Sequence, residues 1–310
     1  MVQGEIDRRQ VSIPIVADFL LHLVTEKNLS VSAVKGYRSA LAPVLRLHGV
    51  DISTSPEISS LLKSLELDVP STLRLVPRWD VTLVLRYLQR APFEPLDQAS
   101  LRLVTLKTVL LLALASSKRA SEIHGLSYIV SNKRDWSGAT LSFLPEFVAK
   151  TQDPARPETA PRPFEIPALS EILDFSDRDR LLCPVRALRE YLKRTAGYRP
   201  ACRGLFVSTN RRNPRNVSKN TISFWIREVI KSAYAGVDDD LVRSCRLVPH
   251  ETRAIATSLI FSKNISLGPL MNAASWRCNT TFASHYLRDT SHQYMDVRSI
   301  GPIVAAQQIV

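Results

Sequence analysis

Glycine and cysteine are both scarce in this chain of 310 residues. Only 10 residues are glycine, whereas 45% are hydrophobic, and this composition favours a globular, helix-rich protein over a fibrous or disordered one. The four cysteines are widely scattered and form no C-x-x-C pair, so we expect no zinc site. So few cysteines in a large chain fit a reducing intracellular compartment.

Long apolar runs are missing as well. The longest, around residues 109–115, is far shorter than the roughly 20 residues that a bilayer span requires. The chain begins Met-Val-Gln-Gly-Glu, without the apolar core of a secretory signal. We therefore expect no signal peptide, no membrane span and no membrane partner.

Acidic residues are outnumbered by basic ones. The 41 lysines and arginines exceed the 29 aspartates and glutamates and give a formal net charge of +12. A surplus of this size attracts polyanions, of which nucleic acid is the commonest, although anionic membranes and ribosomes attract basic proteins too. Charge alone therefore leaves the partner open.

The first 75 residues have the pattern of a small helical domain. Pro14 stands where a helix can begin, and Ser30 is a plausible N-cap for a second helix. Apolar residues recur at helical spacing in both segments: Val16, Phe19, Leu20 and Leu23, then Val34, Tyr37, Leu41, Val44 and Leu45. A further short helix is expected over residues 58–67.

Three basic residues of the second helix fall together on another face: Lys35, Arg38 and Arg46. One interpretation is a solvated stripe on the outside of a core helix. The other is a helix that rests against DNA phosphates. The pattern does not decide between them.

Residues 70–77 have the composition of a linker, with prolines at both ends, and a larger second domain, 76–310, is expected to follow. Its helices are expected over 81–89, 99–116, 185–194, 218–229, 250–263, 266–274 and 280–287. Short strands are expected over 139–143, 146–150, 163–166 and 205–207. The predicted fold class is mainly α with a small antiparallel β-sheet in the second domain.

Four short stretches of the second domain carry residues suited to phosphodiester chemistry. They are Lys118-Arg119-Ala120-Ser121-Glu122-Ile123, Val148-Ala149-Lys150-Thr151, His250-Glu251-Thr252-Arg253, and Trp276 followed ten residues later by Tyr286. Two guanidiniums can clamp the non-bridging oxygens of a phosphate. A phenol can attack phosphorus if its proton is removed, and a lysine or histidine can protonate the leaving sugar oxygen.

Together these stretches resemble the active site of the tyrosine recombinases, the phage-integrase family. That family has, in this order, an arginine in an R-x-x-E-[IL] segment, a lysine on a β-turn, H-x-x-R, a histidine or tryptophan, and a tyrosine nucleophile. The matching residues are Arg119, Lys150, His250 with Arg253, Trp276 and Tyr286. Any one motif is weak, but five in the family's order are specific. The resemblance covers the motifs of residues 77–290.

The resemblance implies the role of each residue. Tyr286 attacks the scissile phosphate to give a 3′-phosphotyrosyl link and a free 5′-hydroxyl. The phosphate is held by Arg119 and Arg253. Proton transfer is assisted by His250, while Lys150 protonates the leaving oxygen. Two further residues support the site: Glu122 orients a basic residue, and Trp276 donates a hydrogen bond beside the tyrosine.

The resemblance also implies partners and cellular context. The fold expected is a two-domain clamp on double-stranded DNA, with self-association into a tetramer on two DNA sites and with neither a metal nor another cofactor. The sequences from Cys183 to Leu188 and from Ala273 to Arg277 resemble those of the recombinases of DIRS-type and Ngaro-type retrotransposons or of Crypton elements. A role in mobile-element integration or excision, and a nuclear location, follow from that likeness alone.

One departure affects the nucleophile. In the family the tyrosine often lies nine positions after the histidine/tryptophan position, whereas Tyr286 lies ten positions after Trp276. The fallback is Tyr294, eighteen residues beyond Trp276.

Taken singly, several of the matching residues can have a structural role instead of a catalytic one. Arg119 can be a favourable cation at a helix C-terminus, Lys150 an ordinary solvated lysine, and Trp276 part of a core. His250 can be a neighbour of a helix N-cap. The combination of motifs is what favours catalysis.

DNA contacts away from the scissile phosphate are expected from a basic segment before and at the start of a helix, made of Arg211, Arg212, Arg215 and Lys219.

The apolar tail, residues 300–306, can either dock on a neighbouring subunit or pack on its own domain. Two alternative functions remain. One is a type IB topoisomerase, and the other is a non-catalytic DNA-binding protein derived from a recombinase.

Overall fold

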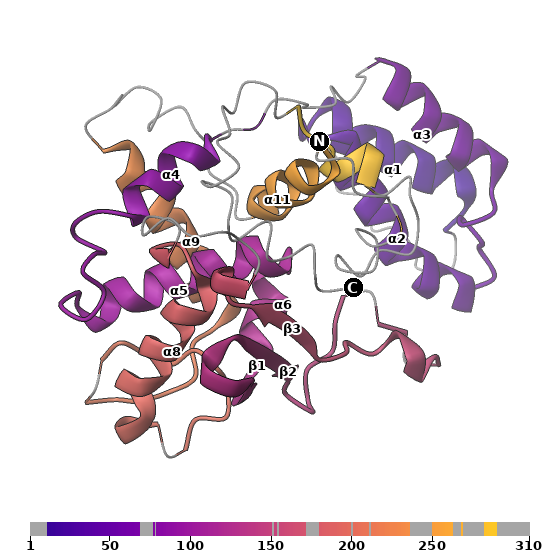
Figure 1. Cartoon of the computed structure of the whole chain (residues 1–310). Helices are drawn as coiled ribbons and strands as arrows, with labels where there is room; N and C mark the ends of the chain where they lie inside the picture. Colours follow the sequence, from indigo (N-terminus) through magenta and orange to yellow (C-terminus); the bar gives the residue numbers. More distant parts are fainter. Residues whose placement is uncertain are drawn as a thin grey trace. The chain divides into compact units, whose positions relative to one another are not determined.

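The computed structural model divides into two compact units, Met1–Leu73 and Arg74–Val310. The residues described are 11–68, 77, 79–150, 152–153, 155–171, 180–199, 201–210, 212–235, 250–262, 268 and 282–289. Figure 1 traces the whole chain from indigo at the N-terminus to yellow.

In its described part, residues 11–68, the N-terminal unit contains three helices, α1 (Ile13–Thr25), α2 (Val31–Leu47) and α3 (Pro56–Asp68). The expected N-cap of the second helix is confirmed, because the Ser30 hydroxyl accepts a hydrogen bond from the Ala33 backbone. The core joins residues of all three helices, namely Val16, Leu20, Leu23, Val34, Leu45, Ile58 and Leu62. The expected apolar face of α2 is wrong in part, since Tyr37 and Val44 are 45% and 54% exposed.

Six regular helices are found in the described part of the C-terminal unit. They are α4 (Val81–Leu88), α5 (Leu101–Ser116), α6 (Ala120–His124), α8 (Pro184–Thr195), α9 (Lys219–Tyr234) and α11 (His250–Ser262). Asp80, Ser100 and Ser218 cap α4, α5 and α9 through their side chains. The strongly apolar α5 is buried from Val104 to its end, and it packs against α8, α9 and α11.

Short irregular helices are also found among the described residues. They are the 3₁₀ turns η1 (Arg134–Trp136), η2 (Pro157–Thr159), η3 (Leu169–Glu171) and η4 (Ala196–Tyr198), and one π-helical turn, η5 (Phe282–Tyr286).

The sheet has three antiparallel strands in the order β1 (Leu126–Asn132), β2 (Gly138–Phe143) and β3 (Phe164–Pro167). The expected strands near 139–143 and 163–166 are confirmed as β2 and β3. The first strand, β1, was not expected. Its burial does not alternate, because Tyr128 and Ile129 are both exposed, and its register with β2 shifts between Leu126 and Val130.

The expectation of a strand over 146–150 is wrong, and so is the placement of Lys150 on one. The segment turns back on itself, with the Phe147 backbone donating to Leu144 and Gln152 donating to Ala149. Val148 is 67% exposed, so its side chain is not buried against a sheet. Residues 205–207 are likewise no regular strand and contain only an isolated bridge, from Val207 to Asn216.

A buried ion network fixes the loop between α4 and α5. The Lys107 ammonium is fully buried and contacts the Leu88 carbonyl at 2.7 Å and the Glu94 carboxylate. Arg186 of α8 donates two hydrogen bonds to the Glu94 carboxylate, at 2.7 and 3.0 Å. Burial lowers the pKa of Lys107 to about 8. Burial acts to raise the pKa of Glu94, but hydrogen bonds from Arg186 and Lys107 outweigh it and hold that pKa below its usual value.

Candidate active site

The first arginine of the site stands at the start of α6. Helix α5 ends at Ser116, its C-cap Ser117 has a left-handed backbone with φ of 51°, and the chain then enters α6 with Arg119 as its N-cap. The Glu122 carboxylate, three residues later, accepts a hydrogen bond of 2.7 Å from the Arg119 backbone. This local contact fixes Glu122 and its arginine relative to each other.

Glu122 also reaches the second arginine, far along the chain. The Arg253 Nη1 atom donates to Glu122 Oε2 at 3.0 Å, and Arg119 Nη1 is 3.8 Å from the same oxygen. Only 2% of Glu122 and 1% of Arg253 are exposed. The carboxylate therefore lies between two guanidiniums that come from α6 and α11.

Positive charge exceeds negative charge around this carboxylate. Burial, opposed by Glu122, lowers the pKa of Arg253 to about 10, so the guanidinium stays protonated at neutral pH. Burial also lowers the pKa of the neighbouring Lys118, and the charges of Arg253 and Arg119 act in the same direction. Such a surplus inside a protein favours an added anion.

One nitrogen of this group has spare hydrogen-bonding capacity. Arg119 Nη1 is buried and, within the described part of the chain, has no hydrogen-bond partner. An unsatisfied buried N–H is costly, and an anion in the adjoining cavity is one way to satisfy it.

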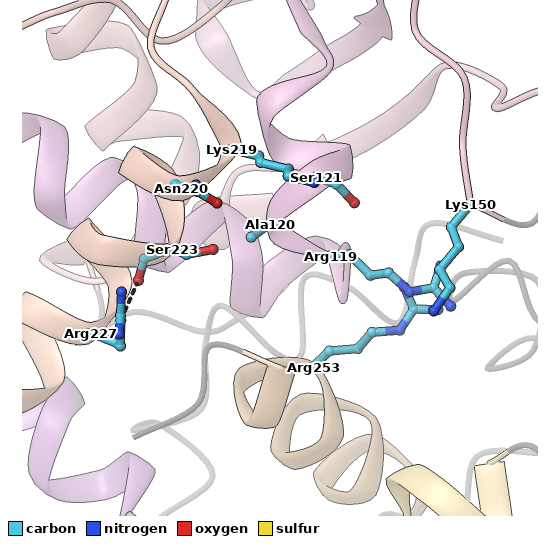
Figure 2. Close-up of a pocket in the computed structure, with 9 residues that line it drawn as sticks. All are labelled: Arg119, Ala120, Ser121, Lys150, Lys219, Asn220, Ser223, Arg227 and Arg253. Atoms are coloured by element: carbon cyan, nitrogen blue, oxygen red, sulfur yellow. Dashed lines mark hydrogen bonds between the residues drawn. The ribbon is translucent and has the colours of Figure 1, made fainter. Parts of the chain in front are cut away.

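That cavity has a volume of about 400 Å³ and is lined by Arg119, Ala120, Ser121, Lys150, Lys219, Asn220, Ser223, Arg227 and Arg253. Figure 2 shows Lys150 reaching from the loop after β2 toward the Arg119 and Arg253 side chains. The arginines can form paired hydrogen bonds and the lysine adds a mobile point charge. Three cations from three separated segments thus line one cavity, a suitable arrangement for a phosphate.

The other end of the cavity is formed by α9. Lys219, Ser223 and Arg227 are four residues apart and share one face of that helix (Figure 2). The buried residues Ile222, Trp225, Ile226 and Val229 lie on the other face. The sequence interpretation included Lys219 alone. Polar residues repeating every fourth position opposite an apolar face were the signal that could have found the others.

Tyr286 lies against the second arginine. The Arg253 guanidinium carbon is 5.5 Å from the centre of the phenol ring, within cation–π range. The ring belongs to the π-helical turn η5, and the tyrosine is half-buried. Arg253 therefore contacts the supporting carboxylate Glu122 and the expected nucleophile at the same time.

The structure describes some of the other expected site residues and not others. His250 begins α11, three residues before Arg253, and only its backbone is described. Trp276, Arg211, the fallback Tyr294 and the tail 300–306 lie outside the described residues. Arg212 and Arg215 belong to the loop before α9, and Arg215 lines a second cavity with Arg102, Asn216 and Thr221.

The three basic residues of α2 all have partners within the N-terminal unit. Lys35 pairs with Glu66, and Arg46 pairs with Asp51 at 2.9 Å. Arg38 donates to the Ser53 carbonyl at 2.7 Å. Arg38 and Arg46 also line a shallow cavity of about 450 Å³ beside Ser53.

Among the described residues, no three His, Cys, Asp or Glu side chains are grouped as a metal site requires. None of the described helices combines the length and apolar character of a membrane span.

Comparison with known proteins gives a structural likeness. No family model matches the sequence, and no curated protein matches it either. The structure is similar to the "lambda integrase(75-356) dimer bound to a COC' core site", with a TM-score of 0.53 and 17% identity, over 93% of this chain and 84% of that one. The likeness supports the expected fold class, mainly α with a three-stranded antiparallel sheet, and the architecture matches the catalytic domain of lambda integrase.

Two further solved structures match more loosely. One is a lambda integrase tetramer bound to a Holliday junction, with a TM-score of 0.48 and 16% identity over 93% of this chain and 67% of that one. The other is XerA recombinase, with a TM-score of 0.42 and 14% identity over 95% and 82%.

Proposed function

We propose that this protein is a tyrosine recombinase that cleaves and rejoins DNA strands through Tyr286. The observation that carries the proposal is the meeting of Arg119, Lys150 and Arg253 at one cavity, with the Arg253 guanidinium within cation–π range of the Tyr286 ring. These four residues occur in the order of the family's motifs and come from four separate segments. The integrase-like fold supports the same function.

The first chemical task is to hold the scissile phosphate. Arg119 and Arg253 bind its non-bridging oxygens, and their positive charge stabilises the charge that develops there in the transition state. Glu122 holds the two guanidiniums at a fixed separation, because its carboxylate contacts both. Glu122 is thus a positioning residue.

The second task is the transfer itself. The Tyr286 oxygen bonds to phosphorus while the bond from phosphorus to the 5′ oxygen breaks, and a 3′-phosphotyrosyl link results. His250 takes the phenol proton, and Lys150 gives a proton to the 5′ oxygen. Trp276 donates a hydrogen bond to the phosphate. Rejoining is the reverse reaction with the 5′-hydroxyl of another strand.

No nucleotide or metal is consumed in this scheme. The phosphotyrosyl bond keeps the energy of the phosphodiester, and cationic side chains provide the charge stabilisation. We therefore propose that the enzyme works without a cofactor, and strand cleavage should continue in a chelating buffer.

The proposed substrate is double-stranded DNA. Arg211, Arg212, Arg215 and Lys219 would contact its backbone beside the site, and Lys35, Arg38 and Arg46 would contact it from the N-terminal unit. Lambda integrase is described as a DNA-bound dimer and as a tetramer on a Holliday junction. We propose a tetramer on two DNA sites, acting in integration or excision of a nuclear mobile element, as the likeness to DIRS, Ngaro and Crypton recombinases implies.

Covalent trapping tests the function. Nicked duplexes enriched by binding from a random pool are mixed with wild-type protein, Tyr286→Phe and Tyr294→Phe, in buffer with a chelator. We expect a DNA-linked protein band on a denaturing gel for wild type and Tyr294→Phe alone. A band that survives in Tyr286→Phe and disappears in Tyr294→Phe would move the nucleophile.

The trapping result also separates the other functions. Tight binding with no band on any enriched duplex would favour a non-catalytic DNA-binding protein. A Tyr286-dependent band together with relaxation of supercoiled plasmid by monomers would favour a type IB topoisomerase.

A further inference from the structure

The segment that carries Tyr286 is attached to α11 by a serine hydroxyl. Ser258 Oγ donates a hydrogen bond to the Tyr286 carbonyl at 3.1 Å and accepts one from the Arg288 backbone at 2.8 Å. Ser258 is 2% exposed. A single hydroxyl thus donates to the backbone carbonyl of Tyr286 and accepts from the backbone amide of Arg288, two residues later.

A second set of contacts reinforces this attachment. The Arg288 side chain donates to the carbonyls of His285 and Leu287, at 3.2 and 2.9 Å. The same guanidinium is 3.7 Å from the carboxylate of Glu251, in the first turn of α11. Arg288 therefore binds the backbone around Tyr286 and ties it to the helix that carries Arg253.

Apolar contacts hold the beginning of the segment. Phe282 is buried, and its ring meets the ring of Phe261, near the end of α11, edge to face at 5.3 Å. The Leu287 backbone closes the π-helical turn by donating to the Phe282 carbonyl. Contacts with α11 are thereby distributed from Glu251 to Phe261, and Ser258 lies between them.

We infer that Ser258 is a positioning residue for the nucleophile, because its hydroxyl holds the backbone of Tyr286 on the helix that supplies Arg253. This inference rests on the proposed function of Tyr286. A phenol attacks phosphorus only along a narrow line of approach, and displacement by about 1 Å can reduce the rate on the order of 100-fold. Ser258 touches neither the phosphate nor the phenol oxygen in this account, and it acts through the position of the tyrosine.

The test compares Ser258→Ala with a variant that keeps the hydroxyl, Ser258→Thr. The matched control is Thr108→Val, which removes another buried hydroxyl that joins two elements, α5 and the Ala187 carbonyl of α8, away from the cavity. For Ser258→Ala we expect covalent trapping about 10-fold to 100-fold slower, with unchanged affinity for DNA before cleavage. Ser258→Thr should restore most of the rate, and Thr108→Val should cleave as wild type does.

A second readout does not depend on catalysis. In Ser258→Ala, deuterium uptake should become faster in peptides that cover residues 282–289, because the Arg288 amide loses its acceptor, and stay unchanged in residues 251–262. If Ser258→Ala does not fold, Arg288→Met loosens the same attachment, since it removes the Nη1 donor that binds both carbonyls, and a smaller slowing of the same kind is expected.

The outcomes separate this inference from the proposed function. Absence of any Tyr286-dependent adduct in the wild type would refute the function, and the uptake measurement would still decide whether Ser258 holds the segment. Wild-type trapping rates in Ser258→Ala, an equal loss of DNA affinity and trapping, or unchanged uptake in 282–289 would each overturn the inference.

Discussion

The basic residues of the two units differ in what surrounds them. In the N-terminal unit, Lys35 and Arg46 each have a carboxylate partner of their own and remain largely exposed to water. In the C-terminal unit, Arg253 is buried, the Arg119 side chain is only 9% exposed, and the two share the carboxylate of Glu122. Basic residues that look alike in the sequence therefore differ in how strongly their charge can act on a bound anion. The exposed pairs are screened by solvent, whereas the buried arginines keep a positive field that can act on a bound anion.

The largest expected effect comes from replacing a buried guanidinium with an ammonium. Arg253→Lys keeps the charge beside Glu122 but loses paired hydrogen bonding, so the rate of covalent trapping should fall on the order of 100-fold to 1,000-fold. The matched change in the N-terminal unit, Arg38→Lys, should alter that rate little. Quenched-flow trapping on a nicked duplex measures both. Equal rates for Arg253→Lys and wild type would remove Arg253 from the phosphate site.

The next effect concerns stability. Glu94→Gln removes the shared partner of Lys107 and Arg186, and the fully buried Lys107 is left without a countercharge. We expect the free energy of unfolding of the C-terminal unit to fall by about 3 kcal/mol. The exposed counterpart, Glu66→Gln, should cost under about 1 kcal/mol because Lys35 remains hydrated. Urea denaturation measures both changes.

A double variant checks the cause of that loss. In Glu94→Gln with Lys107→Met, the uncompensated ammonium is gone, so part of the lost stability should return. If the double variant is less stable than Glu94→Gln alone, the cost comes from packing and not from charge.

The helices show how much of this fold could be predicted. The Ser30 cap and apolar residues at helical spacing located α2, similar spacing located α4 and α9, and a strongly apolar run located α5, because these signals act over a few neighbouring residues. The strand β1 gave no such signal. Tyr128 and Ile129 are apolar but exposed, so the alternation expected of a half-buried strand is absent.

The site was predictable to a lesser degree. The order of motifs selected Arg119, Lys150, Arg253 and Tyr286, but no local pattern states that a loop brings Lys150 to the two arginines. The contacts of Ser258 with the Tyr286 segment were missed for the same reason. A serine inside a helix has no sequence signature for a hydrogen bond to a backbone 28 residues away.

Salt dependence gives a smaller, graded test of DNA binding. Each phosphate contact that is lost should reduce the slope of log affinity against log salt concentration by about 0.9. We expect this change for Lys219→Gln, because Lys219 lines the cavity. Arg46→Gln should change the slope less, since Arg46 is already paired with Asp51. Equal changes in the two variants would show that the partner in the N-terminal unit does not restrain Arg46.

The smallest effect is the titration of the carboxylate that pairs with Arg46. The hydrogen bond from Arg46, followed by that from the Ser53 backbone, lowers the pKa of Asp51 from 3.8 to about 2. The unfolded chain therefore binds more protons between these two pH values, and the contribution of Asp51 to stability is present above about 3.8 and is lost as the pH falls through about 2. An NMR titration of the carboxyl carbon should show this midpoint in wild type and a higher one in Arg46→Gln. A wild-type midpoint near 3.8 would mean that Arg46 is not paired in solution and is as available to DNA as the cations of the cavity.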